Sequence, residues 1–382
     1  MKPSSKANQP RPRFCVLGAG HGGQAMAADL ALRGFPVHLY NRSPERLEPI
    51  KLQGGIELVH MQTSLETGRA GQAQFVPLEV VTTDMAQALE GVDILMVVVP
   101  ANGHRFMAEK CAEHLQDGQI VVLNPGRTGG ALEFVHILNQ RGVKADVIVA
   151  EAQTFIHASR CTNPAQVTLY RTKNNVPVAA LPAYRTPEVV QALRPAYPQF
   201  VPGDNVLKTS LNNIGAIFHP AIMIMNTGRI ESTDGDFEYY VHGVTPSVAQ
   251  LLEKLDAERV AVSEALGIRA MTAREWLYVA YDAVGRNLFE AMRRNLGYKG
   301  IKAPATIFHR YITEDVPMSL VPMASFGNML GVPTPVIHSL IHIASALHGT
   351  DFWAHGRTVE TLGLQGMSVR EIRHFVLEGT RE

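Results

Sequence analysis

The chain has 382 residues, and 46% of them are hydrophobic, which is enough apolar material for two domains that each bury a core. Its 35 Lys and Arg balance its 35 Asp and Glu, so no overall charge favours nucleic acid or an anionic membrane surface as a partner. The cysteines Cys15, Cys111 and Cys161 are too scattered for a disulfide framework or a zinc site, and no apolar run is long enough to span a membrane. We therefore expect a cytoplasmic protein without a metal ion.

The first half of the chain alternates strand and helix patterns. A polar, proline-bearing stretch over residues 1–12 predicts a disordered tail, and the apolar run 14–17 predicts the first strand. A helix is then expected from Gly22 to Arg33, a second strand over 36–40, and a short helix that starts at Ser43 and Pro44. Apolar strands over 91–100, 119–126 and 146–153, with helices over 102–115 and 131–141 between them, predict a doubly wound α/β fold with a parallel sheet.

The second half is dominated by helical patterns. From about residue 205 onward, apolar residues recur at helical spacing, with Ser247, Thr272 and Ser368 as candidate N-caps and Gly267 and Gly349 as candidate stops. We predict a Rossmann-type nucleotide domain over 13–190 and an all-helical catalytic domain over 191–382, with the cleft between them as the default site.

A glycine pattern follows the first strand and opens the first helix. Gly18, Gly20 and Gly23 form G-x-G-x-x-G, with His21 and Gly22 inside the same turn. Backbone N–H groups at a helix start favour phosphate, so these residues predict a dinucleotide site. The alternative is a glycine-rich turn that holds no ligand.

The residues after the second strand bear on the choice of nucleotide. An acidic residue there would bind a ribose hydroxyl and repel a 2′-phosphate, but the chain has Asn41, Arg42 and Ser43. Because a guanidinium can bind phosphate with two parallel hydrogen bonds, we expect NADP, with NAD as the alternative if Arg42 is only a solvated surface residue. Arg46, one turn further on, either assists or faces water.

Other residues follow later strands of the expected sheet. Pro100 and Ala101 follow the strand over 91–100, and Gln153 and Thr154 follow the strand over 146–153. Ligands of such sheets bind at the carboxyl ends of the strands. We therefore expect Pro100 and Ala101 to contact the cofactor, and Gln153 and Thr154 to contact the substrate.

One histidine lies in an unusual context in the helical half. His219 is followed by Pro220 in an apolar stretch, and on a continuous helix Asn212, His219 and Asn226 would share one face. Further along, Arg310 could bind a carboxylate, and Asp315 could accept a hydrogen bond from a histidine nitrogen. The alternative is that these charged residues only cap helices.

The segments GAGHGG, VVVPANGH, NPGRTGG, EAQTF, IFHPAIMIMNTGRIE and RYITEDVPMSLVP resemble the opine dehydrogenases, the octopine and nopaline dehydrogenase group. The resemblance covers roughly residues 13 to 355 in order. It implies reductive condensation of an α-keto acid with the amino group of an amino acid, or the reverse oxidation. It also implies that His219 is the acid/base, Asp315 its partner and Arg310 a carboxylate binder. A homodimer is a further expectation.

Two other functions fit the same two-domain plan. One is an NADP-dependent reductase of 2-keto acids or 3-hydroxy acids, for which Lys208 would be the acid/base. The other is a sensor that binds NADP without turnover and needs none of these catalytic residues. Tyr239, Tyr240, Trp276 and Tyr281 are candidate lining residues, although aromatic side chains in helical domains usually belong to the core.

Overall fold

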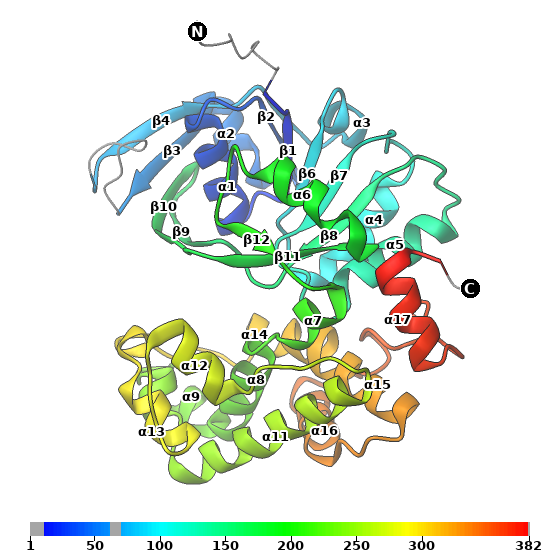
Figure 1. The fold of residues 1–382 in the computed structure, drawn as a ribbon. Coiled ribbons are helices and arrows are strands. Elements are labelled where there is room, and N and C mark those ends of the chain that lie inside the picture. Colours follow the sequence, from blue (N-terminus) through cyan, green and yellow to red (C-terminus); the bar gives the residue numbers. More distant parts are fainter. Residues whose placement is uncertain (1–10, 62–69, 381–382) are drawn as a thin grey trace, which may run out of the picture. The chain divides into compact units, whose positions relative to one another are not determined.

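A computed structural model describes residues 11–61 and 70–380 (Figure 1). Its internal contacts divide the chain into two compact units, the first made of Met1–Pro125 and Ile137–Pro202 and the second of Gly126–His136 and Gly203–Glu382. The tail expected over 1–12 lies outside the described residues apart from Arg11 and Pro12. The domain limits expected at residues 12 and 190 stay a prediction.

An eight-stranded sheet forms the centre of the first unit, in the order β12-β11-β8-β7-β6-β1-β2-β5 (Figure 1). The strands are β1 (Phe14–Leu17), β2 (Val37–Tyr40), β5 (Val80–Thr82), β6 (Ile94–Val97), β7 (Ile120–Leu123), β8 (Ile148–Ala152), β11 (Val176–Leu181) and β12 (Phe200–Pro202). The six strands from β5 to β8 run parallel, whereas β11 runs antiparallel to β8 and parallel to β12. The chain leaves β1 toward β2 on one side and reaches β6 on the other, which confirms the doubly wound α/β fold.

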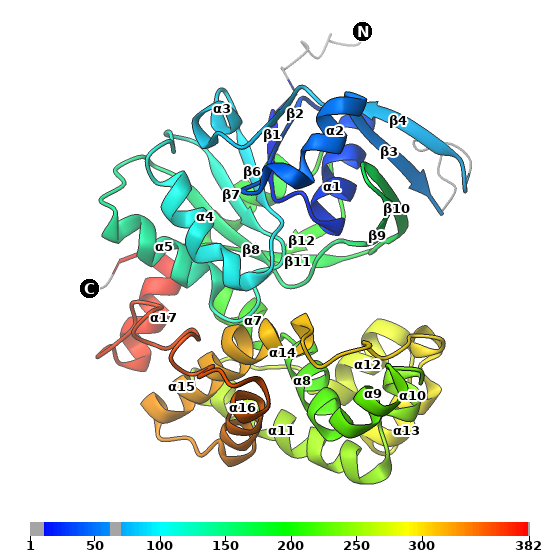
Figure 2. The same cartoon turned by 180° about the vertical axis from the view of Figure 1, so that it is seen from behind.

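Helices connect the strands of this sheet. They are α1 (His21–Leu32), η1 (Pro44–Arg46), α2 (Glu48–Gln53), α3 (Met85–Leu89), η2 (Ala101–Gly103), α4 (His104–Cys111), α5 (Gly130–Gln140), η3 (Ala183–Arg185) and α6 (Thr186–Leu193). Figures 1 and 2 show α1 and α4 on opposite faces of the sheet. Helix α5 begins in the second unit, because residues 126–136 pack with the helical half of the chain.

A second sheet of four strands was not expected from the sequence. It has the order β4-β3-β10-β9, with β3 (Gly55–His60), β4 (Ala73–Pro77), β9 (His157–Asn163) and β10 (Gln166–Thr172). Helix α1 contacts β1 and β2 of the large sheet and all the strands of the small one. The helix that follows the glycine turn is therefore covered by sheet on both sides.

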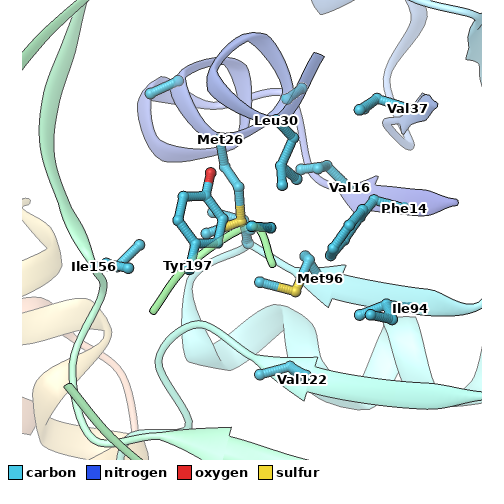
Figure 3. Close-up of a cluster of buried hydrophobic side chains, with 14 of the residues drawn as sticks. Phe14, Val16, Met26, Leu30, Val37, Ile94, Met96, Val122, Ile156 and Tyr197 are labelled. Carbon is cyan, nitrogen blue, oxygen red and sulfur yellow. The ribbon is translucent and has the colours of Figure 1, made fainter. Parts of the chain in front are cut away.

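The core of the first unit surrounds α1 (Figure 3). Phe14 and Val16 of β1 point into this cluster together with Met26 and Leu30 of α1, and all of these side chains are buried. The intervening Cys15 is also fully buried. Burial of successive residues on one strand means that both faces of the sheet are covered, as the unbroken apolar strand pattern predicts.

The second unit is built from helices and loops, with one isolated bridge between Glu238 and Lys302. The helices are α7 (Val206–Leu211), α8 (Gly215–Met225), α9 (Thr227–Thr233), α10 (Tyr239–His242), α11 (Pro246–Ala265), α12 (Ala273–Tyr281), α13 (Leu288–Arg294), η4 (Leu296–Tyr298), α14 (Arg310–Thr313), the π-helix η5 (Val316–Leu320), α15 (Val321–Leu330), α16 (Pro335–His348) and α17 (Val369–Glu378). The long helix α11 contacts α7, α8, α13, α15 and α16. Within residues 11–61 and 70–380, no helix combines the length and apolar composition needed to cross a membrane.

Local sequence signals place several helix ends. Thr272 and Ser368 cap α12 and α17 with reciprocal glutamate bonds, and Gly349 ends α16 in the left-handed conformation, all as predicted. The prediction for Ser247 is wrong. Thr245 caps α11, because Pro246 takes the first helical position and leaves Ser247 inside the helix.

Candidate active site

The glycine turn between β1 and α1 has little room for side chains except at one position. A Cβ on Gly18 would collide with the carbonyl oxygen of Val98, and one on Gly23 with the carbonyl oxygen of Gly18. A Cβ on Gly22 would lie 2.9 Å from the Phe155 ring. A Cβ on Gly20 would have no neighbour within 4 Å. Gly18, Gly22 and Gly23 therefore allow close packing, while Gly20 leaves backbone open to a ligand.

The start of α1 suits an anion. Gly20 is its N-cap, and no side chain caps the first backbone N–H groups of this helix. The neighbouring His21 ring is held in place, since its Nδ1 accepts a hydrogen bond from the backbone N–H of Cys161 at 2.9 Å. The turn thus presents the start of a helix without a side-chain cap on a rigid support, which fits the pyrophosphate of a dinucleotide.

The end of β2 provides a cation next to this turn. Asn41 uses its side chain within the protein, because its Oδ1 accepts from Ala19 N at 3.0 Å and its Nδ2 donates to Ser43 O at 2.9 Å. Arg42 is exposed, and its guanidinium carbon lies 5.2 Å from the centre of the Phe106 ring of α4. Asn41 therefore fixes the turn, whereas Arg42 offers its charge to a ligand.

The other residues expected at the strand ends also belong to the first unit. Pro100 precedes the buried Ala101 at the start of η2, just beyond β6. Gln153 follows β8 and donates its backbone N–H to Pro177 O at 2.9 Å. The hydroxyl of Thr154 accepts a hydrogen bond from Lys173 Nζ at 2.6 Å. Their assignment to cofactor and substrate stays a prediction.

In the second unit, His219 and Asp315 form a hydrogen-bonded pair. His219 lies in α8, Asp315 lies between α14 and η5, and His219 Nδ1 is 2.8 Å from Asp315 Oδ2. The aspartate side chain is fully buried and 15% of the histidine side chain is exposed. Since an ionised carboxylate can only accept, Nδ1 carries the proton and Nε2 is left with a lone pair.

Aromatic side chains and a backbone contact fix the orientation of this imidazole. The Tyr311 ring stacks on it with 4.0 Å between ring centres and an angle of 15°. Tyr239 donates its hydroxyl to the backbone oxygen of His219 at 2.6 Å. Tyr239 is fully buried, which agrees with the core alternative given for it, while Tyr311 covers one face of the imidazole.

Two arginines from different parts of the chain influence the pair. Arg127, in the loop before α5, places Nη1 3.3 Å from Asp315 Oδ1 and Nε 3.2 Å from Glu314 Oε1. Arg310 is 56% exposed at its side chain, with Nε 3.9 Å from Glu314 Oε2. Arg310 is therefore loosely held and open to a ligand, whereas Arg127 is tied to two buried carboxylates.

These charges set the ionisation of the pair. Burial lowers the pKa of His219, the Asp315 carboxylate opposes that shift, and Arg127 and Arg310 add to it. Burial disfavours the charged form of Asp315, but the charge of Arg127 and the hydrogen bond from His219 oppose this effect, and the pKa of that carboxyl is lowered. Near neutral pH the pair is a neutral imidazole beside an ionised carboxylate, which is the state needed to accept a proton at Nε2.

Some expectations about this site are wrong. Asn212 and Asn226 do not share a helix face with His219, because Asn212 ends α7 and Asn226 ends α8. Asn212 accepts the backbone N–H of Met271, and Asn226 donates to the carbonyl oxygens of Ile222 and Gly243. Both amides are therefore structural.

Sequence reasoning missed Arg127 and Tyr311. The signal for Arg127 was an arginine in a turn otherwise made of Gly, Pro and Thr, and the signal for Tyr311 was an aromatic residue directly after Arg310. Among residues 11–61 and 70–380, no group of His, Cys, Asp or Glu is arranged to hold a metal ion.

Comparisons with known proteins agree with both halves of this description. Residues 202–348 match the family model for the α-helical domain of NAD/NADP octopine/nopaline dehydrogenase, and residues 13–126 match that for the N-terminus of NAD-dependent glycerol-3-phosphate dehydrogenase. An opine dehydrogenase of Arthrobacter sp. (strain 1C) is 37% identical over 363 residues, which cover 95% of this chain and 98% of the relative.

Solved structures share the two-part fold. Octopine dehydrogenase with NADH and L-arginine matches with a TM-score of 0.79 at 21% identity, over 97% of this chain and 99% of that one. Yersinopine dehydrogenase with bound NADP+ matches with a TM-score of 0.73 at 17% identity, over 97% of this chain and 98% of that one. The resemblance seen in the sequence motifs is thus confirmed over nearly the whole chain: this protein belongs to the opine dehydrogenase family and is an NAD(P)-dependent oxidoreductase of the class that acts on CH–NH donors.

Proposed function

We propose that this protein catalyses the NADP-dependent condensation of an α-keto acid with the amino group of an amino acid, and the reverse oxidation, with His219 as the acid/base. The hydrogen bond of 2.8 Å between His219 Nδ1 and the buried Asp315 carries the proposal. An imidazole held in one tautomer by a buried carboxylate presents a single nitrogen, Nε2, for proton transfer.

The chemistry requires protons to move in both directions. In the condensation, the keto oxygen leaves as water, so His219 in its protonated form gives up a proton. In the oxidation, neutral His219 accepts one. Because burial lowers the pKa of His219, the neutral form prevails near neutral pH, and the oxidation is favoured by the resting state of the imidazole.

Both organic substrates carry carboxylates, so a cation is needed to bind them. Arg310 is the candidate in the second unit, because its guanidinium is 56% exposed and only 3.9 Å from the nearest Glu314 oxygen. A substrate carboxylate can replace that long contact with two short parallel hydrogen bonds. Thr154 and Gln153 remain the proposed polar contacts from the first unit.

The residues of the first unit fit a nicotinamide dinucleotide. The uncapped start of α1 and the open face of Gly20 would hold the pyrophosphate, Arg42 and Ser43 would bind the 2′-phosphate of NADP, and Pro100 and Ala101 would border the nicotinamide end. When bound, NADPH supplies the hydride that reduces the imine carbon. The family contains structures with NADH and with NADP+, so the exposed Arg42 is what favours NADP here.

The other functions considered have less support. Lys208, the acid/base of the alternative reductase, is 40% exposed and pairs with the exposed Asp204 at 3.2 Å. A sensor without turnover would have no use for a buried carboxylate that orients a histidine. The expected homodimer and cytoplasmic location stay predictions.

A screen of substrate pairs tests the proposal. Keto acids and amino acids are mixed in all combinations with NADPH, its oxidation is followed by absorbance, and the product is identified by mass spectrometry. We expect NADPH oxidation only when both substrates are present, with a product mass that equals the two substrates joined with loss of one oxygen. Oxidation with the keto acid alone would support the reductase, and binding without turnover of any pair would support the sensor.

A further inference from the structure

Arg127 has an unusual backbone conformation. Its φ of 58° lies in the left-handed region, which favours glycine and is costly for a residue with a side chain. Its neighbours include Gly126 and Gly129, so the chain uses glycine in this loop but not at this position. Non-glycine residues held in this region gather at functional sites. The conformation of Arg127 is therefore typical of a residue whose side chain has a role at a functional site.

The loop around Arg127 is fixed from several sides. The fully buried Arg357 donates from Nη1 to Gly126 O at 3.1 Å and to Thr128 O at 3.2 Å, and its Nε donates to Glu133 at 2.7 Å. Gly129 N donates to the Ser210 hydroxyl at 2.9 Å. These bonds hold the costly backbone conformation and so determine where the Arg127 side chain lies.

The guanidinium of Arg127 meets two consecutive carboxylates. Nε lies 3.2 Å from Glu314 Oε1, Nη2 lies 3.5 Å from Glu314 Oε2, and Nη1 lies 3.3 Å from Asp315 Oδ1. The side chains of Arg127, Glu314 and Asp315 are only 10%, 2% and 0% exposed. Two buried negative charges this close repel each other unless a cation lies between them.

Space for this cation depends on a glycine. Gly215, the first residue of α8, lies between Arg127 and His219, where a Cβ would be 3.3 Å from Arg127 Nη1 and 3.1 Å from His219 Cε1. Such distances are tighter than most Cβ contacts, so a side chain at this position would require the imidazole or the guanidinium to shift by a few tenths of an ångström. The absence of a side chain at Gly215 thus allows the guanidinium and the imidazole to approach the same aspartate.

We propose that Arg127 is a positioning residue for the acid/base pair, which keeps Asp315 ionised and directed at His219 while it balances the charge of Glu314. Without Arg127, the buried carboxylate of Asp315 would lose the cation that lies 3.3 Å from its Oδ1. The carboxylate would then be held less firmly in the orientation in which its Oδ2 accepts from His219 Nδ1. The inference rests on the proposed function only for the role of His219 in catalysis, not for the contacts.

Several other ionisable groups lie near His219. α14 and the turn after it contribute most of them, the loop before α5 contributes Arg127, and α10 contributes the buried Tyr239. Around α14, these groups are His309, which precedes the helix, Arg310 and Tyr311 within it, and Glu314 and Asp315 in the turn after it. On α11, which also packs on α8, Asp256 pairs with Arg259 at 2.6 Å. On α16, His338 bonds to Thr334 and His348 contacts Phe308 and Phe352.

The positive charge of Arg127 shifts the pKa values of His219 and Asp315 in the same direction. It lowers the pKa of His219 and the pKa of Asp315. Removing that charge therefore raises both pKa values, because the imidazolium is no longer repelled and the carboxylate is no longer stabilised. A residue that only supports the fold would not shift the titration of His219 in this direction.

The test is the titration of His219 in Arg127→Gln, followed by NMR of 15N-labelled histidine in the whole protein without substrate. His219 is identified among the 15 histidines by the resonance that His219→Gln removes. We expect a higher pKa in Arg127→Gln than in the wild type, and an intermediate value in Arg127→Lys, because one ammonium cannot contact both carboxylates as a guanidinium does. Arg286→Gln, which removes an exposed charge paired with Glu290, should leave the pKa of His219 unchanged.

Activity provides the second measurement. In the oxidation direction, kcat/KM of Arg127→Gln should fall about 10-fold or more at neutral pH, and its rise with pH should move to higher pH. An unchanged pKa and an unchanged pH profile in Arg127→Gln would overturn the inference while leaving the role of His219 intact. If the wild type turns over no substrate pair, the proposed function fails, yet the NMR titration still decides the role of Arg127. If Arg127→Gln does not fold, Arg127→Lys is compared with the wild type, and equal His219 pKa values would overturn the inference.

Discussion

Replacing Arg42 by Ala should weaken NADPH binding far more than NADH binding. The side chain is exposed and rests on the Phe106 ring, with 5.2 Å between the guanidinium carbon and the ring centre. The 2′-phosphate is the group that distinguishes NADPH from NADH, and it is the group that this cation would bind.

The size of the effect follows from that contact. A hydrogen bond to a charged group contributes about 1.5–3 kcal/mol, and an exposed site favours the lower half of that range. Because about 1.4 kcal/mol corresponds to tenfold in Kd, Arg42→Ala should raise the Kd of NADPH roughly 10- to 30-fold. The Kd of NADH should change by about twofold or less, because NADH has no 2′-phosphate for Arg42 to bind and any cation–π contact of Arg42 with the cofactor would be worth only about 0.5 kcal/mol. Phe106→Leu should weaken NADPH binding by about 2- to 5-fold, because it removes only the ring beneath the cation.

Isothermal titration calorimetry with both cofactors measures these constants. Arg46→Ala is the matched control, because Arg46 is also exposed and lies on the adjoining η1, and the variant decides between the two alternatives given for it, assistance in binding or exposure to water. We expect it to bind both cofactors like the wild type. Equal losses for NADPH and NADH in Arg42→Ala, or equal losses in the Arg42 and Arg46 variants, would refute the reasoning.

Other predictions concern the site and the stability of the first unit. Asp315→Asn should lower kcat about 100-fold or more, because the amide no longer holds His219 in one tautomer, and it should leave the Kd of NADPH unchanged. An unchanged kcat at neutral pH would argue against a catalytic role of the His219–Asp315 pair. Arg310→Gln should raise KM for the substrates about 10- to 100-fold with a smaller change in kcat, as steady-state kinetics with varied keto acid would reveal. His157 is buried and its pKa is lowered to about 4 from 6.5, so the neutral form stabilises the fold above pH 6.5 and this contribution is lost as the pH falls toward 4. The free energy of unfolding should thus fall by ~3 kcal/mol over that range, and urea denaturation of His157→Gln should show a flatter pH dependence.

Local sequence patterns were sufficient to predict the strands of the large sheet and the glycine turn after its first strand. Strands such as β6 are short, fully apolar and bounded by turn residues, and Gly18 and Gly23 stand where side chains would collide. The small sheet lacked such a signal. Its strand β3 pairs with β10 far along the chain, and β9 pairs with β10 with shifts in register, so neither pairing can be read from a local window.

For the site, the sequence indicates a possible pairing of His219 with Asp315, the resemblance to the opine dehydrogenases implies their roles, and helical periodicity is misleading. His219 and Asp315 are hydrogen-bonded, as their residue types allow, while their catalytic roles stay a prediction. The seven-residue repeat predicts one helix face for Asn212, His219 and Asn226, but α7 ends at Leu211, with Asn212 as its C-cap, and α8 begins only at Gly215. Arg127 was missed because its loop follows a strand of the large sheet yet packs with the helical unit, which only the folded chain reveals.

The pH dependence of opine oxidation in the wild type and in His219→Gln tests the central claim most directly. With the product of the active substrate pair as substrate, kcat/KM of the wild type should rise with pH through a pKa below 6.5, as the buried imidazole loses its proton. In His219→Gln that rise should vanish and kcat should drop about 100-fold or more, with the Kd of NADPH unchanged. A variant that kept both the rate and the pH dependence would show that another group moves the proton.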